Sequence, residues 1–301
     1  MLNPHRLGAA LYVPAIHPQL MQIAAGEKLA HVRSLIYCTE DAVHPDDLPL
    51  ALEQLQEFLH ILPPQDKRNH FIRLRNPEVM GQVLALRDLH KIRGFVLPKV
   101  DAGNLHEYAA LQNGPYCLMP TLETADALLE EPMLRLRDIL LQPAWRARVL
   151  CLRIGGNDLF NHLHMRRPRG VTLYETALQG VIARLVGIFR PYGFHLSAPV
   201  FEFLDCPELL AREVRWDLQY GLTGKTAIHP DQVALIEGHY GVSRADKELA
   251  EQILSSRAAV FNVNRTMQEV GTHANWAREI LAAWEVFGEG MADEQKSGQG
   301  G

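Results

Sequence analysis

The sequence has no long hydrophobic run, no pair of cysteines at metal-binding spacing and little net charge. Of its 301 residues, 47% are hydrophobic and 22% are charged, and 30 basic residues face 35 acidic ones. The longest apolar runs are far shorter than the ~18 residues of a transmembrane helix, so we expect no membrane partner. The nearly balanced charge also argues against binding to nucleic acid.

Secretory and common hydrolase signatures are missing as well. The first residues lack a charged head followed by a long apolar stretch, so no signal peptide is expected. No GxSxG motif and no catalytic-cysteine signature occurs. The four cysteines are interpreted as small buried residues of a reduced, cytoplasmic protein; they are Cys38, Cys117, Cys151 and Cys206.

What the sequence does contain is an alternation of short apolar runs and amphipathic stretches. The runs lie at residues 9–14, 34–39, 71–74, 94–100, 116–122, 148–154, 194–200 and 223–228. Eight strand-then-helix units with strands buried on both faces predict an α/β TIM (β/α)8 barrel. A doubly wound open sheet is the alternative, but its usual GxGxxG turn is missing after the first run.

Beyond the eighth unit the pattern changes, which suggests three parts to the chain. We expect a TIM-barrel catalytic domain over residues 1–240 and a C-terminal helical lid or assembly segment over 241–288. Ser243, followed by Asp246 three residues later, is a plausible cap for the first of two helices in that segment. Residues 289–301 are almost without apolar side chains and are expected to be a disordered tail.

The stretch "CLRIGGNDLF" (151–160) places an acid where a buried strand ends. Glu123 ends the preceding strand, and functional groups of TIM barrels gather at these strand ends. Two neighbouring carboxylates repel unless a cation lies between them, and oxygen ligands favour Mg²⁺. Glu123 and Asp158 are therefore predicted metal ligands; the alternative is that each simply caps the next helix.

Two further features of the strand ends suggest substrate binding. The glycines at 155 and 156 would let main-chain N–H groups, near Gly156 and Asn157, hold a substrate carboxylate. Arg73, inside the run "FIRLR", would be costly to bury without a partner. It is predicted to hold a carboxylate or enolate, or to form a structural bridge with Glu40 or Asp41, and these two interpretations can coexist.

Seven motifs in order resemble a known family. They are "LYVPAIHP", "LIYCTEDAVHP", "FIRLRNP", "GFVLPKVD", "PTLETADAL", "RIGGNDL" and "LTGKTAIHPDQV". The chain resembles the citrate lyase beta-subunit-like proteins of the HpcH/HpaI aldolase superfamily, as a divergent member. The resemblance implies a TIM barrel, usually a homotrimer, that makes or breaks carbon–carbon bonds with magnesium.

By the same resemblance, individual residues acquire roles. Glu123 and Asp158 match the metal-binding acids, Arg73 matches the substrate arginine, and Glu40, Asp41 and Lys99 match further active-site residues. Members acting on acyl-CoA esters carry an Asp in a C-terminal Gly-x-Met-Val-Asp stretch, where this chain reads "MQEVGTHANWAREIL". CoA as part of the substrate is thus left open.

The predicted chemistry is cleavage, or formation, of a carbon–carbon bond beside a 2-oxo or 2-hydroxy acid. The base that moves the hydroxyl proton is Glu40, Asp41, His273 or a metal-bound water. One alternative is a non-catalytic barrel that serves as a binding or assembly protein. Another is a lyase for a phosphorylated substrate, held by Arg166 and Arg167 in the loop "MRRPRG", unless that loop is merely solvated.

Overall fold

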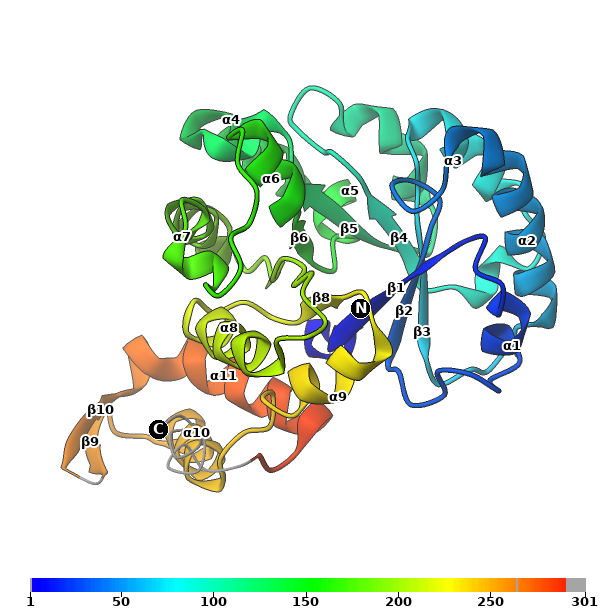
Figure 1. The fold of residues 1–301 in the computed structure, drawn as a ribbon. Helices are drawn as coiled ribbons and strands as arrows, with labels where there is room; N and C mark the ends of the chain where they lie inside the picture. The colour runs from blue at the N-terminus through cyan, green and yellow to red at the C-terminus, as the bar shows by residue number, and fades with distance from the viewer. Residues whose placement is uncertain (1, 264, 291–301) are drawn as a thin grey trace. The chain divides into compact units, whose positions relative to one another are not determined.

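Eight parallel strands form a barrel in the first of two compact units (Figure 1). The computed structural model describes residues 2–263 and 265–290, and the units join in the sequence between Val233 and Ala234. The strands are β1 (Ala9–Pro14), β2 (Ser34–Cys38), β3 (Asn69–Arg73), β4 (Gly94–Leu97), β5 (Cys117–Leu122), β6 (Leu152–Ile154), β7 (Leu196–Ser197) and β8 (Lys225–Ala227).

The order of the strands is that of a TIM barrel. Each strand pairs in parallel with its sequence neighbour from β1 to β7, and β8 returns to pair with β1. Strands β7 and β8 are joined by less pairing than the other neighbours. Ala198 and Lys225 form a single parallel bridge, and the Thr223 N–H donates to the Leu196 carbonyl at 2.7 Å. The predicted fold class is therefore confirmed.

Helices connect the strands on the outside of the barrel, as α2 and α3 do beside β2 and β3 in Figure 1. The helices of this unit are α1 (Leu20–Ala24), α2 (Leu48–Ile61), α3 (Pro77–Leu84), α4 (Glu130–Leu140), α5 (Pro143–Arg146), α6 (Gly156–His162), α7 (Leu178–Phe189) and α8 (Pro207–Gln219), while α9 (Pro230–Glu237) spans the boundary. Helix α2 buries Leu55, Phe58 and Leu59 on one side, as helical spacing requires. The Asn76 side chain caps α3 by accepting from the Val79 N–H.

Inside the barrel an apolar layer lies beneath a polar one. The apolar layer contains Ala10, Ile36, Phe71, Met119 and Cys151, all buried. Side chains two residues apart on a strand share a face, so the next inward positions toward the carboxyl ends are Tyr12, Cys38, Arg73, Thr121 and Arg153. Together with Thr226 these residues form what we call the polar layer, and it makes the floor of the site described below.

The second unit has two helices with a hairpin between them. Helices α10 (Arg244–Ser255) and α11 (Val270–Phe287) pack together, and β9 (Val260–Val263) pairs antiparallel with β10 (Thr266–Glu269). The Ser243 side chain accepts from the Asp246 N–H at 3.0 Å, so the predicted cap is present. The hairpin is an addition to the two helices that the sequence predicts for this segment.

Near the end of this unit the chain is still paired, since Glu289 forms a parallel bridge with Val242. The tail expected from residue 289 lies, from residue 291 onward, outside the described residues. No helix of the described part of the chain is long and apolar enough to cross a membrane. All four cysteines are free; Cys38 and Cys151 are buried, and the other two are partly exposed.

Candidate active site

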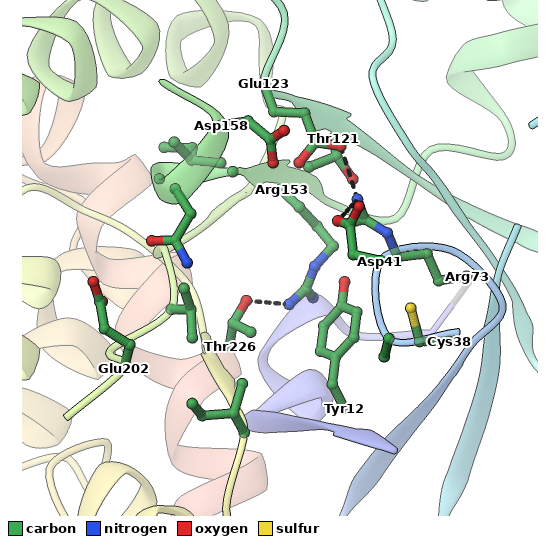
Figure 2. A pocket seen from close by; sticks show the side chains of 17 residues that line it. Tyr12, Cys38, Asp41, Arg73, Thr121, Glu123, Arg153, Asp158, Glu202 and Thr226 are labelled. Atoms are coloured by element: carbon green, nitrogen blue, oxygen red, sulfur yellow. Dashed lines mark hydrogen bonds and ion pairs between the residues drawn. The ribbon is translucent and has the colours of Figure 1, made fainter. Parts of the chain in front are cut away.

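Four carboxylates and two cations gather where strands β2 to β6 end. We call them the mouth cluster, and they are Glu40 and Asp41 after β2, Arg73 at the end of β3, Lys99 after β4, Glu123 after β5 and Asp158 in the first turn of α6. All six were singled out from the sequence as candidate catalytic or metal-binding residues. Figure 2 shows four of them around one cavity, with Asp158 beside Glu123 and Asp41 beside Arg73.

Arg73 is the central cation of the cluster. Its side chain is buried and donates from Nε to Glu40 at 2.5 Å and from Nη2 to Glu123 Oε1 at 3.0 Å. Asp41 lies 3.5 Å from Nη2. The expected bridge to Glu40 is therefore present, and the link to Glu123 was not foreseen. Nη1 has no hydrogen-bond partner among the described residues, so it can still donate to a ligand.

Lys99 contributes both its main chain and its ammonium group. Its φ of 49° is left-handed, a strained conformation for a residue with a side chain. In this conformation its N–H donates to Glu123 Oε1 at 2.9 Å, while Nζ donates to Glu40 at 2.5 Å. Partial burial alone would lower the pKa of Lys99, but the Glu40 carboxylate outweighs burial and raises it. Lys99 therefore stays charged and acts as a donor, not as a base.

Glu123 and Asp158 form the carboxylate pair. Glu123 is 2% exposed, and burial together with the nearby Asp158 charge raises its pKa to about 7, despite the opposing effect of Arg73. Glu123 Oε2 accepts no hydrogen bond from the described residues, and Asp158 has only Lys99 Nζ at 3.9 Å. Neither side chain makes a helix-capping hydrogen bond, so the capping alternative is not what the structure shows.

Gly155 and Gly156 have a role in addition to the one expected from the sequence. A Cβ at position 155 would lie 2.2 Å from Glu123 Oε2, so the glycine makes room for the carboxylate itself. A Cβ at position 156 would lie 2.9 Å from Pro199 Cβ. The two glycines thus clear space for protein side chains. The main-chain N–H groups of Gly156 and Asn157 lie in the first turn of α6, where helical N–H groups lack partners within the helix.

Hydrogen bonds from Arg75 and Thr39 fix the loop that carries Glu40 and Asp41. Arg75 Nη1 donates to the main-chain carbonyls of Thr39, Glu40 and Val43 at 3.0 to 3.4 Å. The Thr39 hydroxyl donates to the Arg73 carbonyl at 2.8 Å. Both contacts tie the loop after β2 to the end of β3, so Glu40 and Arg73 are positioned together.

A cavity of about 250 Å³ opens above the polar layer. Besides that layer, Asp41, Glu123, Asp158, Gly156 and Asn157 line it, whereas Glu40 and Lys99 border an adjoining hollow with Arg75. His273, the third candidate base, belongs to the second unit, near the start of α11.

Arg153, Thr121 and Thr226 also line the cavity but were not singled out from the sequence. For Arg153 a signal existed: it interrupts the apolar run 148–154, just as Arg73 interrupts "FIRLR". The two threonines gave no such signal, because threonine is common in strands.

The basic loop after α6 does not present its arginines together. Arg167 is buried, donates to the Val200 carbonyl at 3.0 Å and pairs with Glu213 and Glu202. Only Arg166 of the two arginines assigned to phosphate is exposed. The phosphate-binding alternative therefore loses one of the two side chains on which it depended.

A family model described as a C–C bond lyase of the TIM-barrel fold matches residues 1–289. A (3S)-malyl-CoA thioesterase of Cereibacter sphaeroides is 27% identical over 299 residues, covering 94% of this chain and 96% of the relative. A citrate lyase subunit beta-like protein of Deinococcus radiodurans is 27% identical over 177 residues, 56% of each chain.

Solved structures share the fold at lower identity. CitE from Mycobacterium tuberculosis, in complex with magnesium, acetoacetate and coenzyme A, superposes with a TM-score of 0.66 at 20% identity, covering 92% of this chain and 98% of that one. A malate synthase of Haloferax volcanii gives a TM-score of 0.63 at 17% identity, covering 76% and 72%.

Proposed function

Because the chain belongs to the family of C–C bond lyases with the TIM-barrel fold, we propose that it is a Mg²⁺-dependent lyase or aldolase. It would cleave or form a carbon–carbon bond beside a 2-oxo or 2-hydroxy acid. The observation that carries this proposal is the charge balance of the mouth cluster, in which four carboxylates meet only two cations. A divalent cation would neutralise the excess of carboxylates and favour the ionised form of Glu123.

The donor set fits Mg²⁺. The oxygens left without protein donors are Glu123 Oε2 and the Asp158 carboxylate, which are hard ligands of the kind Mg²⁺ prefers. The effect of Asp158 on the pKa of Glu123 indicates that the two carboxylates repel each other. These two residues would hold the ion, and when bound it would supply Lewis-acid stabilisation of negative charge developing on the substrate oxygens.

The protein groups around this pair have separable roles. The N–H groups of Gly156 and Asn157 would bind the acid's carboxylate. Arg73, anchored by Glu40 and Glu123, would donate from its free Nη1 to the enolate oxygen. The main-chain N–H groups and the Arg73 guanidinium are hydrogen-bond donors only, so neither can accept the proton of the substrate hydroxyl.

Asp41 is the better placed of the two acids after β2 to carry that proton. It lines the cavity, whereas the Glu40 oxygens are both engaged, Oε1 by Lys99 and Oε2 by Arg73. Its side chain is 63% exposed, which leaves it free to exchange a proton with solvent. We therefore assign the general base to Asp41 and a positioning role to Glu40 and Lys99.

Thioester hydrolysis is a second candidate function. It is favoured by the malyl-CoA thioesterase that matches 94% of the chain. The same charged cluster could stabilise an oxyanion on a thioester carbonyl. A screen of 2-hydroxy acids and acyl-CoA esters separates the two: a lyase releases a keto acid or aldehyde, whereas a thioesterase releases free CoA and an intact hydroxy acid.

Self-association belongs to the proposal as well. We propose a homo-oligomer, a trimer by family resemblance, in which residues 241–288 act as a lid or assembly segment. The hairpin of the second unit exposes Val260 and Met267 by more than half, and large exposed apolar side chains favour burial against a partner.

Metal binding gives the direct test. In titration calorimetry the parent protein should bind Mg²⁺, and Asp158→Asn should weaken binding at least about tenfold because one charged ligand is lost. Asp46→Asn, which removes an exposed acid outside the cluster, is the matched control and should bind as the parent does. Unchanged Mg²⁺ affinity in Asp158→Asn would refute the metal assignment.

A further inference from the structure

Two arginines of the polar layer point into the same cavity, but only one of them is neutralised. Arg73 contacts three carboxylates, while Arg153 forms no ion pair with any described residue. Arg153 is 2% exposed, and its guanidinium carries a permanent charge. A buried cation without a counter-charge is costly, and folded proteins rarely tolerate one without a functional reason.

The contacts of Arg153 hold it in place without neutralising it. Nη2 donates to the Thr226 hydroxyl at 2.6 Å, and Nη1 lies 4.0 Å from the Met119 sulfur. Its guanidinium carbon is 5.4 Å from the centre of the Tyr12 ring (Figure 2). These neutral neighbours orient the guanidinium and leave several of its five N–H donors available to a ligand.

Beside Arg153 lies a buried polar atom, the Thr121 hydroxyl, that has no hydrogen-bond partner among the described residues. Thr121 is paired with Arg153 in the register of β5 and β6, so both side chains enter the barrel at the same level. The Thr121 hydroxyl is buried and hydrogen-bonds to none of the residues that the structure describes. A guanidinium without a counter-charge and a hydroxyl without a hydrogen-bond partner, at one level of the cavity, form a donor pair that suits an anion.

We propose that Arg153 and Thr121 bind a second carboxylate of the substrate, so that the site selects dicarboxylic acids. This inference rests on the proposed function, in which the 2-oxo or 2-hydroxy acid end lies at Glu123 and Asp158. Those acids follow the strand ends, whereas Arg153 and Thr121 lie on the strands, deeper in the barrel. The cavity of about 250 Å³ suits an acid of a few carbon atoms that reaches from one level to the other.

Malate and lactate make a matched pair of probes, because malate differs from lactate only by a carboxylate on C3. With Mg²⁺ present, the parent protein should bind L-malate at least about tenfold more tightly than L-lactate, as a charge-assisted bidentate contact predicts. In Arg153→Met the ratio should fall to about twofold or less with lactate affinity unchanged. Arg166→Met, which removes an exposed arginine, should retain the parent's ratio.

Thr121→Val tests the same site if Arg153→Met does not fold properly. Replacing a hydroxyl that has no partner should leave the melting temperature at or above that of the parent, while malate affinity falls several-fold and lactate affinity does not. A parent that binds malate and lactate equally would overturn the inference. So would a malate preference that survives Arg153→Met.

The ratio of malate affinity to lactate affinity, measured without Mg²⁺, separates this inference from the proposed function. A malate preference that persists in the metal-free protein and disappears in Arg153→Met supports the carboxylate site even if Mg²⁺ fails to bind. Mg²⁺ binding that depends on Asp158, combined with a ratio independent of Arg153, supports the metal site and overturns the dicarboxylate assignment. Tighter binding of 3-phosphonopyruvate than of malate at Arg153 would overturn the choice of a carboxylate.

Discussion

Lys225 on β8 and Arg73 on β3 are both buried cations that contact two or more carboxylates, yet their surroundings differ. Lys225 donates to Glu213 at 3.0 Å and to Asp217 at 2.9 Å. Arg167 also pairs with Glu213, and the Tyr174 hydroxyl donates to Asp217 at 2.6 Å. We call Arg167, Glu213, Asp217 and Lys225 the α8 network; these four buried side chains are two cations and two acids, and Arg167 also contacts the partly exposed Glu202.

The mouth cluster, by contrast, keeps two acids in excess and opens into a cavity. Strand alternation separates the two environments on β8 itself, since Lys225 points outward to α8 and Thr226 points into the barrel. A matched network needs nothing further and stabilises the packing of α8. An unmatched cluster is stable only because surrounding structure holds it, and it gains from a ligand of opposite charge.

The largest expected effect is the loss of stability on breaking the α8 network. Lys225→Met leaves Asp217 buried without a cation and Glu213 with Arg167 alone, which should cost about 3–5 kcal/mol of unfolding free energy. Urea denaturation measures this loss. Because the network lies outside the cavity, Mg²⁺ affinity of the folded variant should equal that of the parent.

An exposed ion pair supplies the control. Arg135→Met breaks a pair with Glu131 on α4 in which both side chains are more than 60% exposed, and it should cost less than about 1 kcal/mol. If Lys225→Met costs no more than Arg135→Met, the distinction between a matched buried network and a surface pair is wrong.

A slightly smaller effect is expected from pH at the start of β3. Burial lowers the pKa of His70 to about 4, although Asp66 Oδ2 lies 3.3 Å from its Nε2. The unfolded chain takes up this proton near pH 6.5, so the stability from neutral His70 is complete above that pH. It is lost as the pH falls to about 4, a change of about 3 kcal/mol.

His70→Gln should remove this part of the pH dependence and leave the rest. Urea unfolding at pH 7, 5.5 and 4.5 should show a difference between variant and parent that shrinks as the pH falls. Burial would raise the pKa of Asp66, but hydrogen bonds from Arg68 outweigh it and lower the pKa to about 2. Asp66 therefore acts below pH 4, outside the measured window. A difference that does not change with pH would contradict the role of His70.

At the other end of β3, Arg73→Lys should affect turnover more than stability. The compact ammonium group cannot contact Glu40 and Glu123 and still donate to an enolate. Turnover of the substrate found by the screen should fall about 10²-fold, or about 2.7 kcal/mol of transition-state stabilisation. A melting temperature well below the parent's with normal turnover per folded molecule would show that Arg73 is only structural.

Much of the barrel was predictable because parallel strands buried on both faces leave apolar runs in the sequence. All eight runs contain the observed strands or overlap them, and β1 matches at both ends. The hairpin of β9 and β10 escaped prediction because its strands, "VFNV" and "TMQE", contain polar residues and are largely exposed, so they leave no continuous apolar run.

The candidate site was predictable where chemistry and position coincide, at acids that follow buried strands. Glu123 and Asp158 are both acidic and both follow a buried strand, so the sequence indicated them. Arg167 did not, because its partner Glu213 lies 46 residues further along the chain and only the packing of α8 brings them together. The sequence likewise showed an arginine at 153, but whether a carboxylate faces it depends on the residues from β5, β1 and β8 that share its level.

Arg75 has a consequence for the thermodynamics of binding. By holding three main-chain carbonyls it orders the loop after β2 before any substrate arrives. Ordering a backbone residue costs about 1–2 kcal/mol of conformational entropy, and here that loss accompanies folding and not ligand association. More of the free energy of contact with a ligand then appears as affinity. Glu40 and Asp41 are already in place when the ligand binds.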